Sequence, residues 1–226
     1  MDEVIHINVG GYITEDEVVS VSKFRLWPAL LAYSRWTLKN VIPGHNLIRS
    51  GIGLSLVNNL AVAVEGFVAD MVVGNLESND QNKSPELIFL ELKATWHHKK
   101  KLFNENFEKG LESYGEFEAV EILFNLRNNM LHGLTHTEQT KRKKDCEEWI
   151  QVISINQKYQ KARDFFISKG LMPDLKTHSS AELLWKLEIV VFLLSQVQLF
   201  LTKIISENNS PKFIGIASEL KNALSL

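Results

Sequence analysis

Several features that mark specialised classes of protein are absent from this sequence of 226 residues. Its single cysteine, Cys146, cannot form an internal disulfide, so we expect a reducing compartment. The 25 basic residues are balanced by 27 acidic ones, which excludes a global basic field and leaves only a local patch for binding nucleic acid. The sequence also contains no glycine-rich phosphate loop, nucleophile elbow or paired-carboxylate motif.

Long apolar runs without a charge are absent as well. Residues 50–74 and 183–205 are the most apolar stretches, but neither reaches eighteen apolar residues without a charged side chain. We therefore predict two buried helices and no membrane association. The first twelve residues have neither a basic region nor a long apolar run, so we expect no secretory signal and a cytoplasmic protein.

Helical periodicity dominates the rest of the chain and predicts an all-α, up-and-down bundle that forms a single domain over residues 1–226. Residues 1–21 are expected to form a β-hairpin appendage that turns at Gly10-Gly11, and residues 208–226 a C-terminal tail with one last short helix. The expected helices cover residues 22–42, about 47–73, 84 to about 111, 116–131, 157–169 and 179–205.

Two helix ends are predicted from local signals. Ser22 is expected to cap the first helix, whose apolar face would carry Leu26, Leu30, Leu31 and Trp36. The central helix over residues 47–73 is apolar nearly all round, and Gly74 with the polar residues after it predicts a loop.

The most informative segment runs from Ala119 to Gly133 and contains Arg127, Asn128 and His132. A guanidinium neutralises phosphate, and a histidine transfers protons near neutral pH. On a helix the three residues lie within an arc of about 140° and can line one cleft. The trio predicts RNA cleavage without a metal; the alternative is an arginine paired on its helix and an unrelated surface histidine.

The segment Leu-Arg-Asn-Asn-Met-Leu-His-Gly, which ends at Gly133, resembles the signature of the HEPN superfamily. That signature is an arginine, often followed by a small polar residue, and a histidine four to six residues later. Upstream, residues 61–70 (AVAVEGFVAD) resemble the central helix of many bacterial HEPN proteins, and Glu65 and Asp70 match its acidic positions.

This resemblance implies a HEPN-like homodimer with a composite active site, in which the motifs of two protomers face each other. Many members are metal-independent endoribonucleases of toxin–antitoxin or anti-phage systems, without a cofactor and with a cognate antitoxin or sensor as partner. Carried onto this chain, Arg127 and His132 would be catalytic and Asn128 supporting. Toxins that their antitoxin modifies have a tyrosine two residues after the histidine; Leu134 stands there, so that mode of regulation is not expected.

Other charged residues have two readings each. Glu65 either holds Arg127 or His132 in place or forms a salt bridge elsewhere, since a buried carboxylate needs a partner. The cluster over residues 97–101 (HHKKK) is interpreted as a solvated helix face rather than an RNA contact. The basic residues that follow the motif are the stronger candidates for RNA binding: Lys141, Arg142, Lys143 and Lys144.

A metal site is not predicted. His132 and His136 have the i, i+4 spacing of a helical metal pair, but Gly133 interrupts the helix and no nearby Cys or Asp completes a ligand set. The leading hypothesis is thus a HEPN-type endoribonuclease. The alternatives are a non-catalytic HEPN-like module that binds RNA or a partner protein, and a helical scaffold in which the motif is coincidental.

Overall fold

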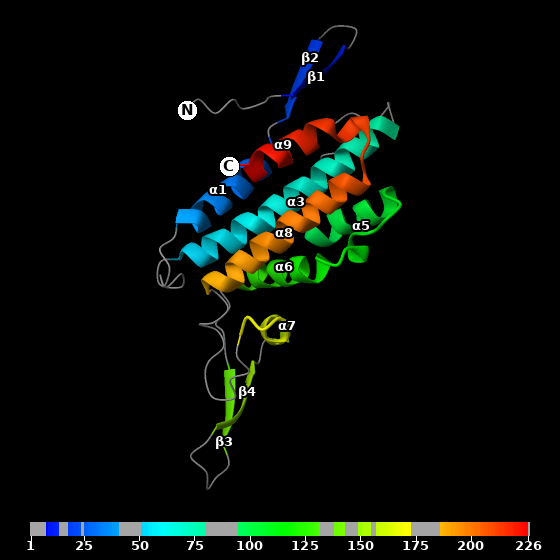
Figure 1. The fold of residues 1–226 in the computed structure, drawn as a ribbon. Helices are drawn as coiled ribbons and strands as arrows, with labels where there is room; N and C mark the ends of the chain where they lie inside the picture. The colour runs from blue at the N-terminus through cyan, green and yellow to red at the C-terminus, as the bar shows by residue number, and fades with distance from the viewer. Residues whose placement is uncertain are drawn as a thin grey trace.

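The chain folds into a bundle of helices with a β-hairpin beyond each end of it (Figure 1). This is a computed structural model, and the predicted all-α bundle is confirmed. The structure describes residues 8–13, 18–23, 25–40, 51–79, 95–131, 138–142, 149–154, 157–172 and 186–225.

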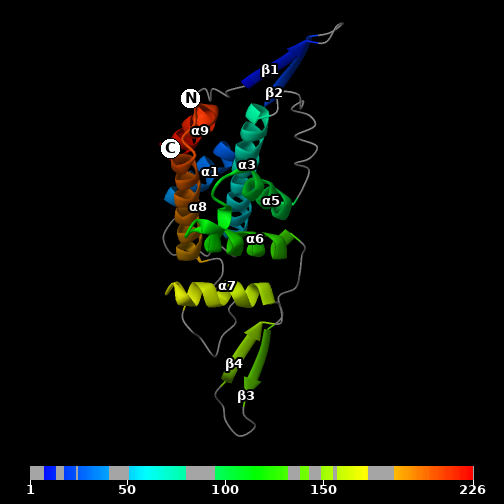
Figure 2. The same cartoon turned by 90° about the vertical axis from the view of Figure 1, so that its right-hand side faces the viewer.

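The bundle is built from helices that pack around one apolar core (Figures 1 and 2). They are α1 (Trp27–Asn40), α3 (Ile52–Asn79), α5 (Trp96–Asn106), α6 (Phe117–Leu131), α8 (Leu187–Glu207) and α9 (Ile214–Ser225). Two short 3-10 helices, η1 (Leu111–Ser113) and η3 (Pro211–Phe213), precede α6 and α9.

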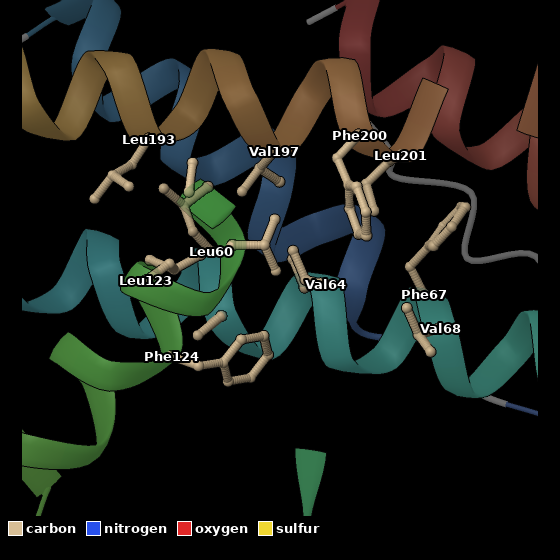
Figure 3. Packing of buried hydrophobic residues seen from close by; sticks show 14 of the residues in the cluster. Leu60, Val64, Phe67, Val68, Leu123, Phe124, Leu193, Val197, Phe200 and Leu201 are labelled. Atoms are coloured by element: carbon tan, nitrogen blue, oxygen red, sulfur yellow. The ribbon is translucent and has the colours of Figure 1, made fainter. Parts of the chain in front are cut away.

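Helix α3 is the centre of this bundle and packs against α1, α5, α6, α8 and α9. From Leu56 to Leu76 every residue of α3 is buried or half-buried. In Figure 3, side chains of α8 and α6 point into the space beside α3 and interdigitate with its apolar face; the labelled residues are Leu60, Val64, Phe67, Val68, Leu123, Phe124, Leu193, Val197, Phe200 and Leu201. Burial on all sides explains why α3 has so few charged residues.

The central helix is longer than predicted, because Gly74 does not end it and α3 continues to Asn79. Gly74 faces Phe213, and a Cβ built on it would lie 3.4 Å from the nearest carbon of that ring. Packing against η3 therefore outweighs the weak helix propensity of glycine here. The expected helix start at residue 84 lies outside the described residues.

The predicted cap of the first helix is wrong. Ser22 lies in a β-strand, and α1 begins at Trp27 with Pro28 in its first turn, where proline costs no helical hydrogen bond. Leu31 is fully buried, but Leu26 and Trp36, both expected on the apolar face, are each 58% exposed. Trp27 takes the buried position, so the buried face of α1 is rotated from the prediction.

The N-terminal hairpin forms, with a different register from the predicted one. Strands β1 (Asn8–Ile13) and β2 (Val18–Lys23) are antiparallel, and Gly10 pairs with Val21 and Gly11 with Ser20. The two glycines thus lie within a strand and not at the turn, because the β-prone residues of β2 pair along the whole length of β1.

A second hairpin, β3 (Glu138–Arg142) with β4 (Trp149–Ser154), was not predicted. Helix α7 (Gln157–Ser168) follows it and packs along α6 on the outside of the bundle (Figure 2). The expected C-terminal tail is part of the bundle, since α9 packs on α1 and α8 through its buried Ile216, Leu220 and Ala223.

Helices α3 and α8 are long and apolar enough to cross a membrane by length and composition alone. Core helices of a bundle meet the same test. About half of the most apolar window of α3, and 44% of that of α8, is buried inside the bundle, where both helices contribute to the same apolar core.

One buried ionic cluster joins α1, α3 and α9. Asp70 of α3 accepts hydrogen bonds from Trp27 Nε1 at 2.7 Å and pairs with Arg25 Nε at 2.8 Å, and Arg25 Nη1 reaches Glu219 of α9 at 2.9 Å. Burial raises the pKa of Asp70, and the opposing effects of Arg25 and of the Trp27 hydrogen bond do not cancel it. Two carboxylates, Asp70 and Glu219, therefore depend on the single cation Arg25.

Replacing Arg25 by methionine is expected to lower the free energy of unfolding by about 2–4 kcal/mol at pH 7. Without Arg25, the pKa of Asp70 should rise further. A carboxyl group whose pKa is raised by folding stabilises the folded state below its unfolded pKa, and this stabilisation is lost as pH rises through the folded pKa. The difference from the wild type should consequently widen between about pH 4 and pH 7 in urea unfolding. A difference that does not change with pH would contradict this account of the cluster.

Gly66 allows α1 to approach α3 closely. A Cβ at this position would lie 3.0 Å from Cβ of Trp27. Trp27 is 2% exposed, packs edge-on against Phe67 with ring centroids 5.3 Å apart, and is tied to Asp70 through its indole N–H. The indole thus has little room to move away from an added methyl group.

The two glycines inside α3 should respond oppositely to alanine. Gly74→Ala is expected to stabilise the protein by about 0.5–1 kcal/mol, because helix propensity improves and the new methyl group makes ordinary contact with Phe213. Gly66→Ala gains the same propensity but overpacks against Trp27, and should destabilise by about 1–2 kcal/mol. Thermal unfolding of the pair measures both, and a stabilised Gly66→Ala would show that α1 can shift.

Candidate active site

Helix α6 presents the described half of the predicted motif near its C-terminal end. Val120, Leu123 and Leu126 are fully buried, and they hold α6 against α3, α7 and α8. Arg127 and Asn128 follow on the last turns and are half-buried. The helix thus anchors itself through apolar residues and leaves its polar end beside the neighbouring helices.

Arg127 is weakly held by its neighbours. Its Nη1 lies 3.7 Å from Oε2 of Glu65 and 3.5 Å from Oδ1 of Asn128, and both distances are long for hydrogen bonds to a guanidinium. Its Nε is buried and has no hydrogen-bond partner among the described residues. The side chain is 23% exposed, so Arg127 retains donors for an anion from solution.

Glu65 comes from the middle of α3 and serves two cations. Its Oε1 accepts a hydrogen bond of 2.7 Å from Nζ of Lys99 on α5, and its Oε2 faces Arg127. Both of the predicted alternatives for Glu65 therefore occur together: an ion pair with Arg127 and a shorter ion pair with Lys99. Two cations around one carboxylate leave an excess of positive charge at this place.

Helix α5 is fixed beside the motif by an aromatic stack. The rings of Trp96 and Phe124 are 4.1 Å apart and nearly parallel, at 8°, and Trp96 Nε1 donates to Glu121 at 2.9 Å. Such a stack contributes about 0.5–1.5 kcal/mol beyond the area that it buries. Phe124 is three residues before Arg127 on α6, so the stack places Lys99 close to the site.

Lys99 is the site residue that the sequence analysis missed, because the cluster over residues 97–101 was interpreted as a solvated face. The cluster is divided between partners. Lys99 faces Glu65, Lys100 lies 3.7 Å from Glu121, and Lys101 is 65% exposed on the outer side. Helical spacing could have identified it. Lys99 is three residues after Trp96 and four before the buried Phe103, which places it on the inward face of α5.

Several predicted site residues fall elsewhere or outside the described chain. Asp70 does not join Arg127, because it belongs to the cluster with Arg25 and Trp27. His132 is the residue directly after the end of α6 and lies outside the described residues, as does His136. Strand β3 contains Lys141 and Arg142, whereas Lys143 and Lys144 lie outside the described residues.

A surface hollow of about 590 Å³ is lined mostly by α7, with one residue from α6, and Arg127 is not among its lining residues. The residues that line it are Glu118, Gln157, Gln160, Lys161, Asp164, Phe165 and Ser168. Glu118 is at the start of α6, about 13 Å along the helix axis from Arg127. The hollow is lined by both acidic and basic side chains, so its charge gives no preference for phosphate. Within the described ranges, no three His, Cys, Asp or Glu residues are grouped to hold a metal ion.

Comparison with other proteins adds no assignment to this geometry: no model of a known protein family, no curated protein and no solved structure matches the chain.

Proposed function

We propose that this protein is a metal-independent endoribonuclease of HEPN type that acts as a cytoplasmic homodimer in toxin–antitoxin or anti-phage defence. The observation that supports the proposal best is the state of Arg127. It lies beside Asn128 near the end of α6, its side chain is 23% exposed, and among the described residues its Nη1 makes only long contacts, of 3.5 Å and 3.7 Å. An arginine that serves only the fold usually satisfies its donors, whereas one that binds a phosphate must keep them free.

The chemistry needs a base, an acid and a group that stabilises charge on phosphorus. One histidine, His132, removes the proton of the RNA 2′-hydroxyl, and the oxygen attacks the adjacent phosphorus. The bond to the 5′ oxygen breaks as the partner protomer's copy of the same histidine donates a proton to it. The products are a 2′,3′-cyclic phosphate and a 5′-hydroxyl. Arg127 stabilises the charge that develops on the phosphoryl oxygens, and Asn128 orients the histidine or the phosphate.

The second candidate is a non-catalytic HEPN-like module that binds RNA or a partner protein. The same partly exposed and loosely held guanidinium of Arg127 favours it, because binding a phosphate requires no proton transfer. The two candidates differ in the role of His132, which the module does not need. A toxin would also need restraint, so the enzyme hypothesis requires a cognate antitoxin or sensor.

The purified protein should cleave total RNA or tRNA in EDTA and leave 2′,3′-cyclic phosphate ends. His132→Ala and Arg127→Ala should each slow cleavage by about 10²–10⁴-fold, because each removes an interaction of the transition state. His97→Ala is the matched control, since this histidine is exposed on α5 and has no role in the proposed reaction. Fragment ends and initial rates are measured on all four proteins.

Equal cleavage by the wild type and His132→Ala would overturn the assigned role of His132. RNA that stays intact with the wild type but binds to it would favour the non-catalytic module. A wild type that sediments as a monomer at the concentration of the assay while remaining active would contradict a composite site.

A further inference from the structure

We propose that Lys99 is a positioning residue of this site: it neutralises Glu65 and so leaves Arg127 free to bind a phosphate of the RNA backbone. The identity of the phosphate rests on the proposed function. The charge balance among the three side chains does not, because it follows from their distances alone.

The carboxylate of Glu65 is divided unequally between its two cations. Lys99 Nζ approaches Oε1 to 2.7 Å, a full hydrogen-bonded ion pair, whereas Arg127 Nη1 stays 3.7 Å from Oε2. An arginine next to a free carboxylate normally forms two short parallel hydrogen bonds with it. Lys99 has taken the closer contact, and Arg127 does not close onto Glu65.

Partial burial strengthens the competition between Lys99 and Arg127 for the carboxylate of Glu65. The side chains of Glu65 and Lys99 are each 15% exposed, and that of Arg127 is 23% exposed. Water and salt screen such charges less than they screen surface charges, so one added or removed charge changes the affinity of its neighbours markedly. Lys99 and Arg127 together outnumber Glu65, and the remaining positive charge is available to an anion.

The fold holds Lys99 in this role. The stack of Trp96 on Phe124 fixes the start of α5 against α6, and the fully buried Phe103 anchors the next turn. Lys99 lies between these two anchors, facing α3. Its neighbours are committed elsewhere: Lys100 lies near Glu112 and Glu121, at 3.5 Å and 3.7 Å, and Lys101 near Glu105.

Without Lys99, Glu65 would turn to Arg127, its other cation in the described structure, and occupy the donors that a phosphate needs. A carboxylate placed there competes with the phosphate directly. The loss should therefore depend on Glu65 and should disappear when Glu65 is neutral. A lysine that touches the phosphate itself would show no such dependence.

Binding to an uncleavable, fully 2′-O-methylated oligoribonucleotide tests the inference apart from catalysis. Fluorescence anisotropy is measured on the full-length protein and on Lys99→Met, Glu65→Gln and the double variant. Lys101→Met is the matched control, because it removes the same charge from the exposed side of the same helix. Inorganic phosphate serves as a competitor, and circular dichroism with thermal unfolding verifies that each variant is folded.

Lys99→Met should weaken binding about tenfold, and Lys101→Met less than about twofold. In the Glu65→Gln background, Lys99→Met should cost less than about threefold. Lys99→Arg keeps the charge and should restore most of the affinity, which keeps the test informative if Lys99→Met fails to fold.

Equal losses for Lys99→Met and Lys101→Met would overturn the inference, as would a double variant that binds no better than Lys99→Met. A wild type that binds neither probe would overturn it too. Binding of inorganic phosphate without the oligonucleotide, with the predicted dependence on Glu65, would retain the anion site and instead refute the RNA substrate. If Lys99 and Glu65 show the predicted dependence in binding but the protein cleaves no RNA, the anion site is retained and only the proposed enzymatic activity is refuted.

Discussion

The burial of α3 on all sides is the constraint on which the rest of the structure depends. From Leu56 to Leu76 none of its positions is exposed, so a carboxylate on this stretch must find a cation from another helix. Glu65 and Asp70 are the two that it carries there. Each carboxylate binds cations from neighbouring elements. Asp70 pairs with Arg25, which precedes α1, and Glu65 pairs with Lys99 of α5 and Arg127 of α6.

The two carboxylates differ in how closely their partners approach them. Asp70 has two close donors, Arg25 and Trp27, and the cluster extends to Glu219 in α9. These close contacts fix the positions of α1, α3 and α9 relative to one another. At Glu65 the lysine is close and the arginine is held at a distance. A buried pair with one loosely held cation contributes less to stability, and it leaves a charged group available for a ligand.

The proposed active site therefore depends on the same burial that shapes the bundle. The apolar residues of α6 hold its C-terminal end beside α3, and the stack of Trp96 on Phe124 brings α5 to the same place. Arg127 then lies where three helices meet, close enough to Glu65 to form an ion pair and too far for a short hydrogen bond. Rigid surroundings of this kind are what a phosphate-binding group needs in order to act without reorganisation.

Local pattern was sufficient for much of this protein. The apolar periodicity of α6, α7 and α8, the all-round apolar character of α3 and the β-branched run of β2 each identify an element from its own residues. The spacing of Arg127 and His132 is likewise a property of the sequence alone. Local pattern failed where packing overrides propensity: at Gly74, which stays helical against Phe213, and at Ser22, which pairs in a strand. Only the tertiary structure decided that Lys99, 34 residues from Glu65 in the sequence, is its closer partner while Arg127 lies 3.7 Å from it. The choice between cations depends on how three helices pack, and no single helix carries that information.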